Sequence, residues 1–127
     1  MNNVVAYFEI QATEPETLKT FYGKLFGWKF TPQQDMPVPY WSIETGDDVR
    51  GGLLRRTIAA PPAGSSTNAY TCSIMVERFD EMAKYIVANG GKVAMEKFAV
   101  PGKCWQGYFL DPDNNTFGIF QPDPDAK

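Results

Sequence analysis

The sequence comprises 127 residues, enough for one domain with a sizeable hydrophobic core. It holds 12 lysine and arginine residues against 15 aspartate and glutamate residues, and it contains no basic cluster. That balance excludes nucleic acid and anionic membrane surfaces as expected partners. Histidine is absent, so the commonest general base and the commonest transition-metal ligand are both missing.

The first half of the chain predicts a strand, a helix and three further strands. Residues 4–12 alternate as a strand that places Tyr7 and Glu9 on one face. Thr13 begins a capping box with a proline in the first turn, which predicts a helix over residues 14–26. The other expected strands cover residues 28–31, 40–45 and 52–57.

The second half predicts the same order of elements. A strand over residues 70–76 and a helix over residues 79–89 are followed by the glycine stop Gly90-Gly91. The remaining strands are expected over residues 92–96, 105–110 and 116–121, with a loop over residues 98–103. Apolar side chains recur at i, i+3, i+4, i+7 and i+8 in both helices. They are Leu18, Phe21, Tyr22, Leu25 and Phe26 in the first helix and Phe79, Met82, Ala83, Ile86 and Val87 in the second.

This duplication predicts a pseudo-symmetric α+β fold of two βαβββ modules, with the functional site between the halves. The helices are expected to cover one face of the sheet and to leave the other face concave and partly open. We expect one domain over residues 1–127, with module one over about residues 1–58 and module two over about residues 69–122. The linker between them, over about residues 59–68, is rich in proline and serine.

Several motifs in this order resemble the vicinal oxygen chelate superfamily, which includes glyoxalase I, bleomycin-resistance proteins, fosfomycin-resistance enzymes and extradiol dioxygenases. The motifs are Phe8-Glu9-Ile10, Leu25-Phe26-Gly27-Trp28, Gly51-Gly52-Leu53, Asn89-Gly90-Gly91 and Asp111-Pro112-Asp113-Asn114-Asn115. The resemblance implies that the two modules form a curved, partly open barrel-like sheet with the helices on its outer face. It also implies a divalent metal held on the concave face by ligands from both modules.

This chain departs from the family at the metal positions. The positions that the resemblance assigns to the four ligands fall on Tyr7, Gly52 or Leu53, Thr71 and Gly118. These side chains cannot form the nitrogen and oxygen site that Zn²⁺, Mn²⁺, Ni²⁺ or Fe²⁺ requires. We therefore expect no metal and no other cofactor.

Glu9 is the sharpest single candidate for chemistry. A carboxylate on a concave, semi-apolar face could serve as a general base or bind a cation. The alternative is a structural role, in which Glu9 pairs with Arg50, Arg55 or a backbone donor and organises the sheet.

Aromatic and polar residues on the expected concave face are the candidates for ligand contacts, since small-molecule pockets combine the two. The expected ligand-binding residues are Tyr7, Glu9, Trp41, Thr71, Ser73, Trp105 and Tyr108. Strand alternation separates Trp105 from Tyr108, so only one of the two is expected to face the cavity.

Four local features complete the predictions. Gly51-Gly52 predicts a close backbone approach or a bulge. Asp111 is expected to begin a turn that satisfies its own backbone groups rather than a calcium loop. The acidic tail Asp123-Pro124-Asp125 is expected to fray. Cys72 and Cys104 are expected to be free thiols, with Cys72 in the core, because the chain opens without a signal peptide and therefore indicates a cytoplasmic protein.

Three classes of function fit this pattern. The first is metal-independent binding of a small organic molecule, for which the resemblance to bleomycin-resistance proteins implies a homodimer. The second is metal-independent acid–base catalysis of an isomerase or lyase type, with Glu9 as base and Tyr7 as proton donor or oxyanion stabiliser. The third is an interaction module with a filled cavity. A metal-dependent lyase or dioxygenase ranks below all three.

Overall fold

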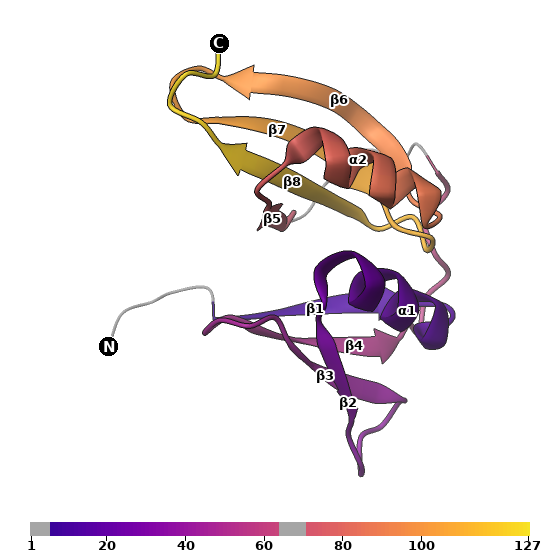
Figure 1. The fold of residues 1–127 in the computed structure, drawn as a ribbon. Helices are drawn as coiled ribbons and strands as arrows, with labels where there is room; N and C mark the ends of the chain where they lie inside the picture. Colours follow the sequence, from indigo (N-terminus) through magenta and orange to yellow (C-terminus); the bar gives the residue numbers. More distant parts are fainter. Residues whose placement is uncertain (1–5, 64–70) are drawn as a thin grey trace. The chain divides into compact units, whose positions relative to one another are not determined.

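The computed structural model describes residues 6–63 and 71–127, which divide into two compact units, Met1–Ala60 and Pro61–Lys127 (Figure 1). We describe each unit by itself. The unit boundary falls inside the segment expected to link the modules, and residues 64–68 of that segment lie outside the described residues.

The first unit is a βαβββ module. Its elements are β1 (Tyr7–Ala12), α1 (Pro15–Phe26), β2 (Lys29–Pro32), β3 (Tyr40–Glu44) and β4 (Arg50–Arg55). The strands form one sheet in the order β1-β4-β3-β2, in which β1 and β4 are parallel and the other neighbours antiparallel.

The second unit repeats this plan, which confirms the predicted duplication and the α+β class. Its elements are β5 (Ser73–Met75), α2 (Phe79–Ala88), β6 (Lys92–Val100), β7 (Cys104–Leu110) and β8 (Thr116–Pro122). The order β5-β8-β7-β6 matches that of the first sheet, with β5 and β8 as the parallel pair. Each helix lies against its own sheet in Figure 1.

The predicted helix faces contribute buried side chains to each core. Leu18, Phe21, Tyr22 and Leu25 of α1 are buried, and so are Ile43 and Leu53 of the sheet. Gly27 ends α1 in the left-handed conformation, with φ 71°, which glycine adopts without strain. The second helix has a narrower apolar face, because Phe79 and Ile86 are buried whereas Val87 is 51% exposed.

Several boundaries differ from the predictions. Glu14 rather than Thr13 occupies the N-cap position of α1, without a capping side-chain hydrogen bond, and the helix begins at Pro15. Strand β6 continues to Val100, through a segment expected to be a loop, because it pairs with β7 as far as Val100 opposite Cys104. Strand β5 begins only at Ser73, and Tyr70 of the expected strand lies outside the described residues.

Two predicted environments in the second unit are wrong. Cys72 is exposed rather than buried, because it precedes β5. The inward-facing positions of this segment are Ile74 and Val76. The acidic tail is held in place: Asp123 accepts a hydrogen bond from the Trp105 indole at 2.9 Å, and Ala126 is 3% exposed. Cys72 and Cys104 are both free thiols, as expected.

The predicted turn at Asp111 is confirmed. Its carboxylate is buried and accepts hydrogen bonds from the backbone N–H groups of Asp113 and Asn115 at 2.8 and 3.0 Å. The turn therefore satisfies its own backbone groups. No helix in the described part of the chain is long and apolar enough to cross a membrane.

Candidate functional site on the open face of the first sheet

Two consecutive glycines make room for aromatic rings on the two faces of the first sheet. A Cβ atom at Gly51 would meet the ring of Phe8, and a Cβ atom at Gly52 would meet the hydroxyl end of Tyr40. Successive strand residues face opposite sides of a sheet. Phe8 packs near Trp28, which follows α1, so Tyr40 lies on the opposite face, which we call the open face. The register is continuous here, so the glycines accommodate side chains rather than a bulge or an approaching backbone.

Three side chains on the open face form a chain of hydrogen bonds. The Tyr40 hydroxyl donates to Glu9 Oε2 at 2.8 Å and lies 2.7 Å from the Tyr7 hydroxyl. Glu9 and Gly52 are register partners on β1 and β4, and the Tyr40 side chain reaches Glu9 across Gly52 from β3. We call Tyr7, Tyr40 and Glu9 the tyrosine–glutamate triad.

The members of the triad differ in their exposure to solvent. Tyr40 is buried, whereas Tyr7 is 47% exposed and Glu9 is also exposed. Burial, followed by the hydrogen bonds to Tyr7 and Glu9, raises the pKa of Tyr40 well above its ordinary value of 10.0. Tyr40 is thus a fixed, protonated link between two residues that solvent and ligands can reach.

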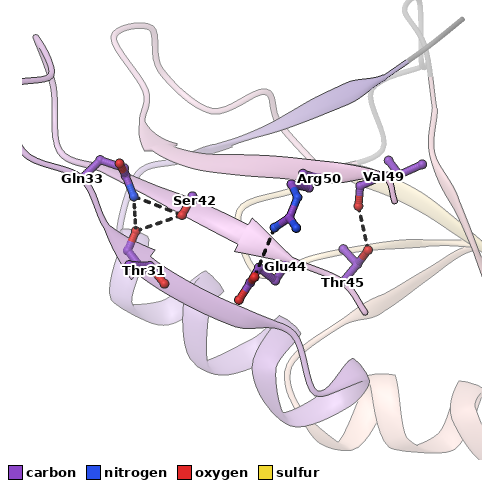
Figure 2. Close-up of polar contacts among 7 residues, drawn as sticks. All are labelled: Thr31, Gln33, Ser42, Glu44, Thr45, Val49 and Arg50. Carbon is purple, nitrogen blue, oxygen red and sulfur yellow. Dashed lines mark hydrogen bonds and ion pairs between the residues drawn. The ribbon is translucent and has the colours of Figure 1, made fainter. Parts of the chain in front are cut away.

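Two charged residues on this face, Arg50 and Glu44, are paired with each other. Arg50 Nη1 lies 3.1 Å from Glu44 Oε1, and the two are cross-strand register partners (Figure 2). Arg50 and Arg55 were the candidate partners for Glu9. Among the described residues, Glu9 instead accepts its hydrogen bond from Tyr40. Farther across the same face, Gln33 donates to Ser42 Oγ at 3.1 Å and to the Thr31 carbonyl at 3.3 Å (Figure 2).

The second unit carries a weaker counterpart at the equivalent register. Gly118 lies between Ser73 and Tyr108, as Gly52 lies between Glu9 and Ser42. The residue equivalent to Tyr40 is Gln106, two positions before Tyr108, and it donates to Ser73 Oγ at 3.1 Å. This pair holds no carboxylate and no phenol hydroxyl.

The predicted ligand-binding residues separate onto different faces. Tyr7 and Glu9 come together in the first unit, and Ser73 and Tyr108 both border Gly118 in the second. Thr71 is half-buried and precedes β5.

The two predicted tryptophans lie on the other faces of their sheets. Trp41 alternates with Tyr40 and therefore shares the face of the buried Ile43. Trp105 lies on the helix side of its sheet, where Lys97 Nζ stands 4.7 Å from the Trp105 ring and 5.5 Å from the Phe79 ring. Of Trp105 and Tyr108, Tyr108 is the one that shares a face with Ser73.

Sequence reasoning missed Tyr40 and Gln106. The available signal was the glycine at the centre of each parallel strand pair, because a strand glycine often marks the place where another group approaches closely. The space above such a glycine can be filled by a large polar side chain that lies on the neighbouring strand, two residues before the glycine's register partner.

The residues at the family's metal positions do not fit a metal. In the first unit, Gly52 offers no ligand atom and the Tyr40 hydroxyl occupies the place of its Cβ. In the second, Ser73 Oγ and Gln106 Nε2 would lie 2.5 and 2.7 Å from a Cβ at Gly118. Among residues 6–63 and 71–127, no three histidine, cysteine, aspartate or glutamate side chains come together as a possible metal site. The described residues at these positions therefore support no metal-dependent step.

The tandem βαβββ units and the glycine-centred polar face define a two-module α+β protein of the vicinal oxygen chelate type. The sequence matches the glyoxalase/bleomycin resistance protein/dioxygenase superfamily over residues 4–119, and the chain belongs to this family. No curated protein sequence is similar enough to count as a match.

Solved structures share this fold at low sequence identity. The fosfomycin resistance protein FosX from Listeria monocytogenes superposes with a TM-score of 0.76 at 14% identity, over 97% of this chain and 94% of that chain. A glyoxalase/bleomycin resistance protein/dioxygenase family enzyme from Burkholderia phytofirmans gives 0.71 at 17% identity, over 93% and 98%. The hypothetical protein SA1046 from S. aureus gives 0.69 at 20% identity, over 93% and 96%. These similarities establish the fold. Any activity has to be inferred from the residues of this chain.

Proposed function

We propose that this protein binds a small organic molecule on the open face of its first sheet, through the tyrosine–glutamate triad and without a metal. The observation that carries the proposal is the triad itself. A buried phenol holds two exposed oxygen-bearing side chains at 2.7 and 2.8 Å, so both are oriented before a ligand arrives. Preorganisation of this kind lowers the entropy lost on binding.

The donor set supports metal independence. The resemblance assigns one ligand to Gly52 or Leu53 and another to Gly118, and none of these residues has a side-chain donor atom. FosX has been solved with Mn(II) and 1S,2S-dihydroxypropylphosphonic acid, in a mutant that superposes on this chain with a TM-score of 0.74. The residues of this chain support a different mode, in which aromatic and carboxylate groups contact the ligand directly.

A thermal-shift screen against a small-molecule library, with and without chelator, tests the proposal. A ligand at about a hundredfold excess over its dissociation constant stabilises the folded state by about 2.7 kcal/mol. We expect hits that chelator leaves unchanged and that Glu9→Gln and Tyr40→Phe weaken. Glu16→Gln is the matched control, because it removes the same charge from an exposed ion pair on α1. Hits that only a divalent metal enables would contradict the proposal.

Acid–base catalysis is the second candidate, because the triad is also a continuous path of short hydrogen bonds that ends at a carboxylate. Glu9 would act as the general base on a bound substrate. Turnover that survives chelator, is abolished in Glu9→Gln and persists in Glu16→Gln would favour this function over binding alone.

We also propose that the protein is a homodimer, since the resemblance to binding-only members of the family implies a groove shaped by two subunits. Light scattering coupled to size-exclusion chromatography tests this directly. A monomer at all measured concentrations would reject it.

A further inference from the structure

The direction of the hydrogen bonds in the triad determines what Tyr7 and Glu9 can offer to a ligand. An ionised carboxylate only accepts hydrogen bonds, and a tyrosine has one proton to donate. Tyr40 gives its proton to Glu9 at 2.8 Å, so its oxygen acts as the acceptor in the 2.7 Å contact with Tyr7. Tyr7 therefore donates its only hydroxyl proton to the Tyr40 oxygen.

Tyr40 maintains this direction because it stays protonated. Its burial and its position beside the Glu9 carboxylate raise the pKa of Tyr40, so the phenolate form is suppressed. The link cannot reverse unless Glu9 itself takes up a proton.

The groups left over on the exposed side are all acceptors. The Tyr7 oxygen keeps free lone pairs on a side chain that is 47% exposed. Oxygen Oε1 of Glu9 has no hydrogen-bond partner among the described residues, and Glu9 is exposed. The arginine beside Tyr7 on this face, Arg50, is engaged by Glu44 at 3.1 Å. The triad thus presents two acceptors and one carboxylate charge.

We infer that the ligand bound at this face carries a protonated amine or guanidinium group, which donates to the Tyr7 hydroxyl oxygen and to Glu9 Oε1. This inference rests on the proposed function and specifies its ligand class. A donor-rich cation matches both acceptors and the charge, whereas a carboxylate or phosphate would meet only lone pairs and a like charge. An oxyanion-stabilising role for Tyr7 is disfavoured for the same reason, because its proton is already used.

Three probes that share a phenyl ring and differ in the head group test the inference: benzylamine, benzyl alcohol and benzoate. Their binding at neutral pH is followed by NMR titration, with the resonances of Tyr7 and Glu9 locating the site. We expect benzylammonium to bind about tenfold or more tightly than benzoate, the size expected of a hydrogen-bonded charge contact. Glu9→Gln should abolish this preference, and Glu16→Gln should keep it.

A second pair of variants separates the Tyr7 acceptor from a general effect of removing a phenol. Tyr7→Phe should weaken benzylammonium binding severalfold, and Tyr85→Phe, which removes a hydroxyl from a side chain of the same 47% exposure on α2, should not. Tyr40→Phe releases the Tyr7 proton, so the ratio of benzylammonium to benzoate affinity should fall. Equal loss in Tyr7→Phe and Tyr85→Phe would overturn the assignment of the acceptor.

The outcomes distinguish this inference from the function on which it rests. If benzoate binds as tightly as benzylammonium, or if no probe perturbs Tyr7 and Glu9, the inference is overturned. If the library screen yields chelator-independent hits that depend on the triad but carry no amine or guanidinium, the inference fails and the proposed function stands. If the screen yields no hit that depends on the triad, both fail.

Discussion

The hydroxyl of Tyr40 lies where a Cβ atom at position 52 would project. Gly52 sits between Glu9 and Ser42 in the first sheet, so the phenol ring crosses β4 at the one open-face position of that strand without a side chain. This crossing lets a residue of β3 reach Tyr7 and Glu9 on β1, two strands away. The triad therefore depends on glycine at position 52.

Gly52→Ala should displace the Tyr40 ring and break the triad. The ring is buried and cannot simply swing into solvent, so the added methyl group should lower the free energy of unfolding by about 1–3 kcal/mol. Ligand binding at the open face should be lost as well. Urea unfolding and the NMR titration measure the two effects.

Gly23→Ala is the matched control for this change. Gly23 lies within α1, and the nearest atom to an added Cβ would be 3.7 Å away, an ordinary contact. Alanine in a helix is more stable than glycine by roughly 0.5–1 kcal/mol, so this variant should gain stability and retain binding. Equal stability of Gly52→Ala and the wild type would show that Tyr40 has room to move.

The equivalent change in the second unit, Gly118→Ala, should destabilise less. A Cβ there would lie 2.5 Å from Ser73 Oγ and 2.7 Å from Gln106 Nε2, and both are side chains with freedom to rotate. The lost stability should be about 1 kcal/mol, which is roughly the value of the one hydrogen bond between them. Urea unfolding checks the order, and a loss larger than that of Gly52→Ala would contradict it.

The fold was predictable from local signals, whereas the centre of the site was not. Helical periodicity and glycine stops identified α1, α2 and the repeated βαβββ order, because these features depend on residues close in sequence. Tyr7 and Glu9 were identified by strand alternation. Tyr40 was missed because its role depends on the register of β1, β4 and β3. That register determines which side chain covers Gly52.

Two other predictions failed in the second unit, at the acidic tail and at Cys72. The tail looks ready to fray, yet Asp123 binds the Trp105 indole and the backbone N–H of Asp125. The alternation around Cys72 suits a buried strand, but the strand begins one residue later. For Asp123, the partner Trp105 lies 18 residues away in the sequence, so local patterns could not reveal it.

The tail contact predicts a loss of stability in acid. Hydrogen bonds from the Asp125 backbone and then from Trp105 lower the pKa of Asp123 below its ordinary 3.8. Below that value the unfolded state takes up the proton first, so this stability is present above about pH 3.8 and lost as pH falls through the folded pKa. Asp123→Asn should lack this dependence, and Asp48→Asn should keep it, in urea unfolding measured across acidic pH. Parallel curves for the wild type and Asp123→Asn would reject the contact.

Metal addition and removal should leave the stability unchanged. Because Gly52 and Gly118 contribute no donors, saturating Zn²⁺ or Mn²⁺ should shift the unfolding free energy by less than about 0.5 kcal/mol, against about 2.7 for a ligand at a hundredfold excess over its dissociation constant. Chelator should have no effect on the purified protein. A shift in the unfolding free energy that saturates at one metal ion per chain would contradict this prediction and indicate a metal-dependent protein.

Alkaline pH should weaken the fold through Tyr40. The pKa of Tyr40 in the folded state is raised by burial and by its bonds to Tyr7 and Glu9, so above pH 10.0 the unfolded state releases a proton that the folded state retains. The contribution is fully present below about pH 10.0 and is lost as pH rises toward the folded pKa.

Comparison with Tyr40→Phe isolates this effect. At neutral pH the variant should be less stable than the wild type by about 1–3 kcal/mol, since Glu9 and Tyr7 both lose a hydrogen-bond partner. The difference should shrink as pH rises above 10.0, because only the wild type has a buried phenol that resists ionisation. Tyr85→Phe, on an exposed face of α2, should follow the wild-type curve. Urea unfolding at a series of alkaline pH values measures all three proteins, and a constant difference between wild type and Tyr40→Phe would mean that Tyr40 ionises in the folded state as easily as in the unfolded one.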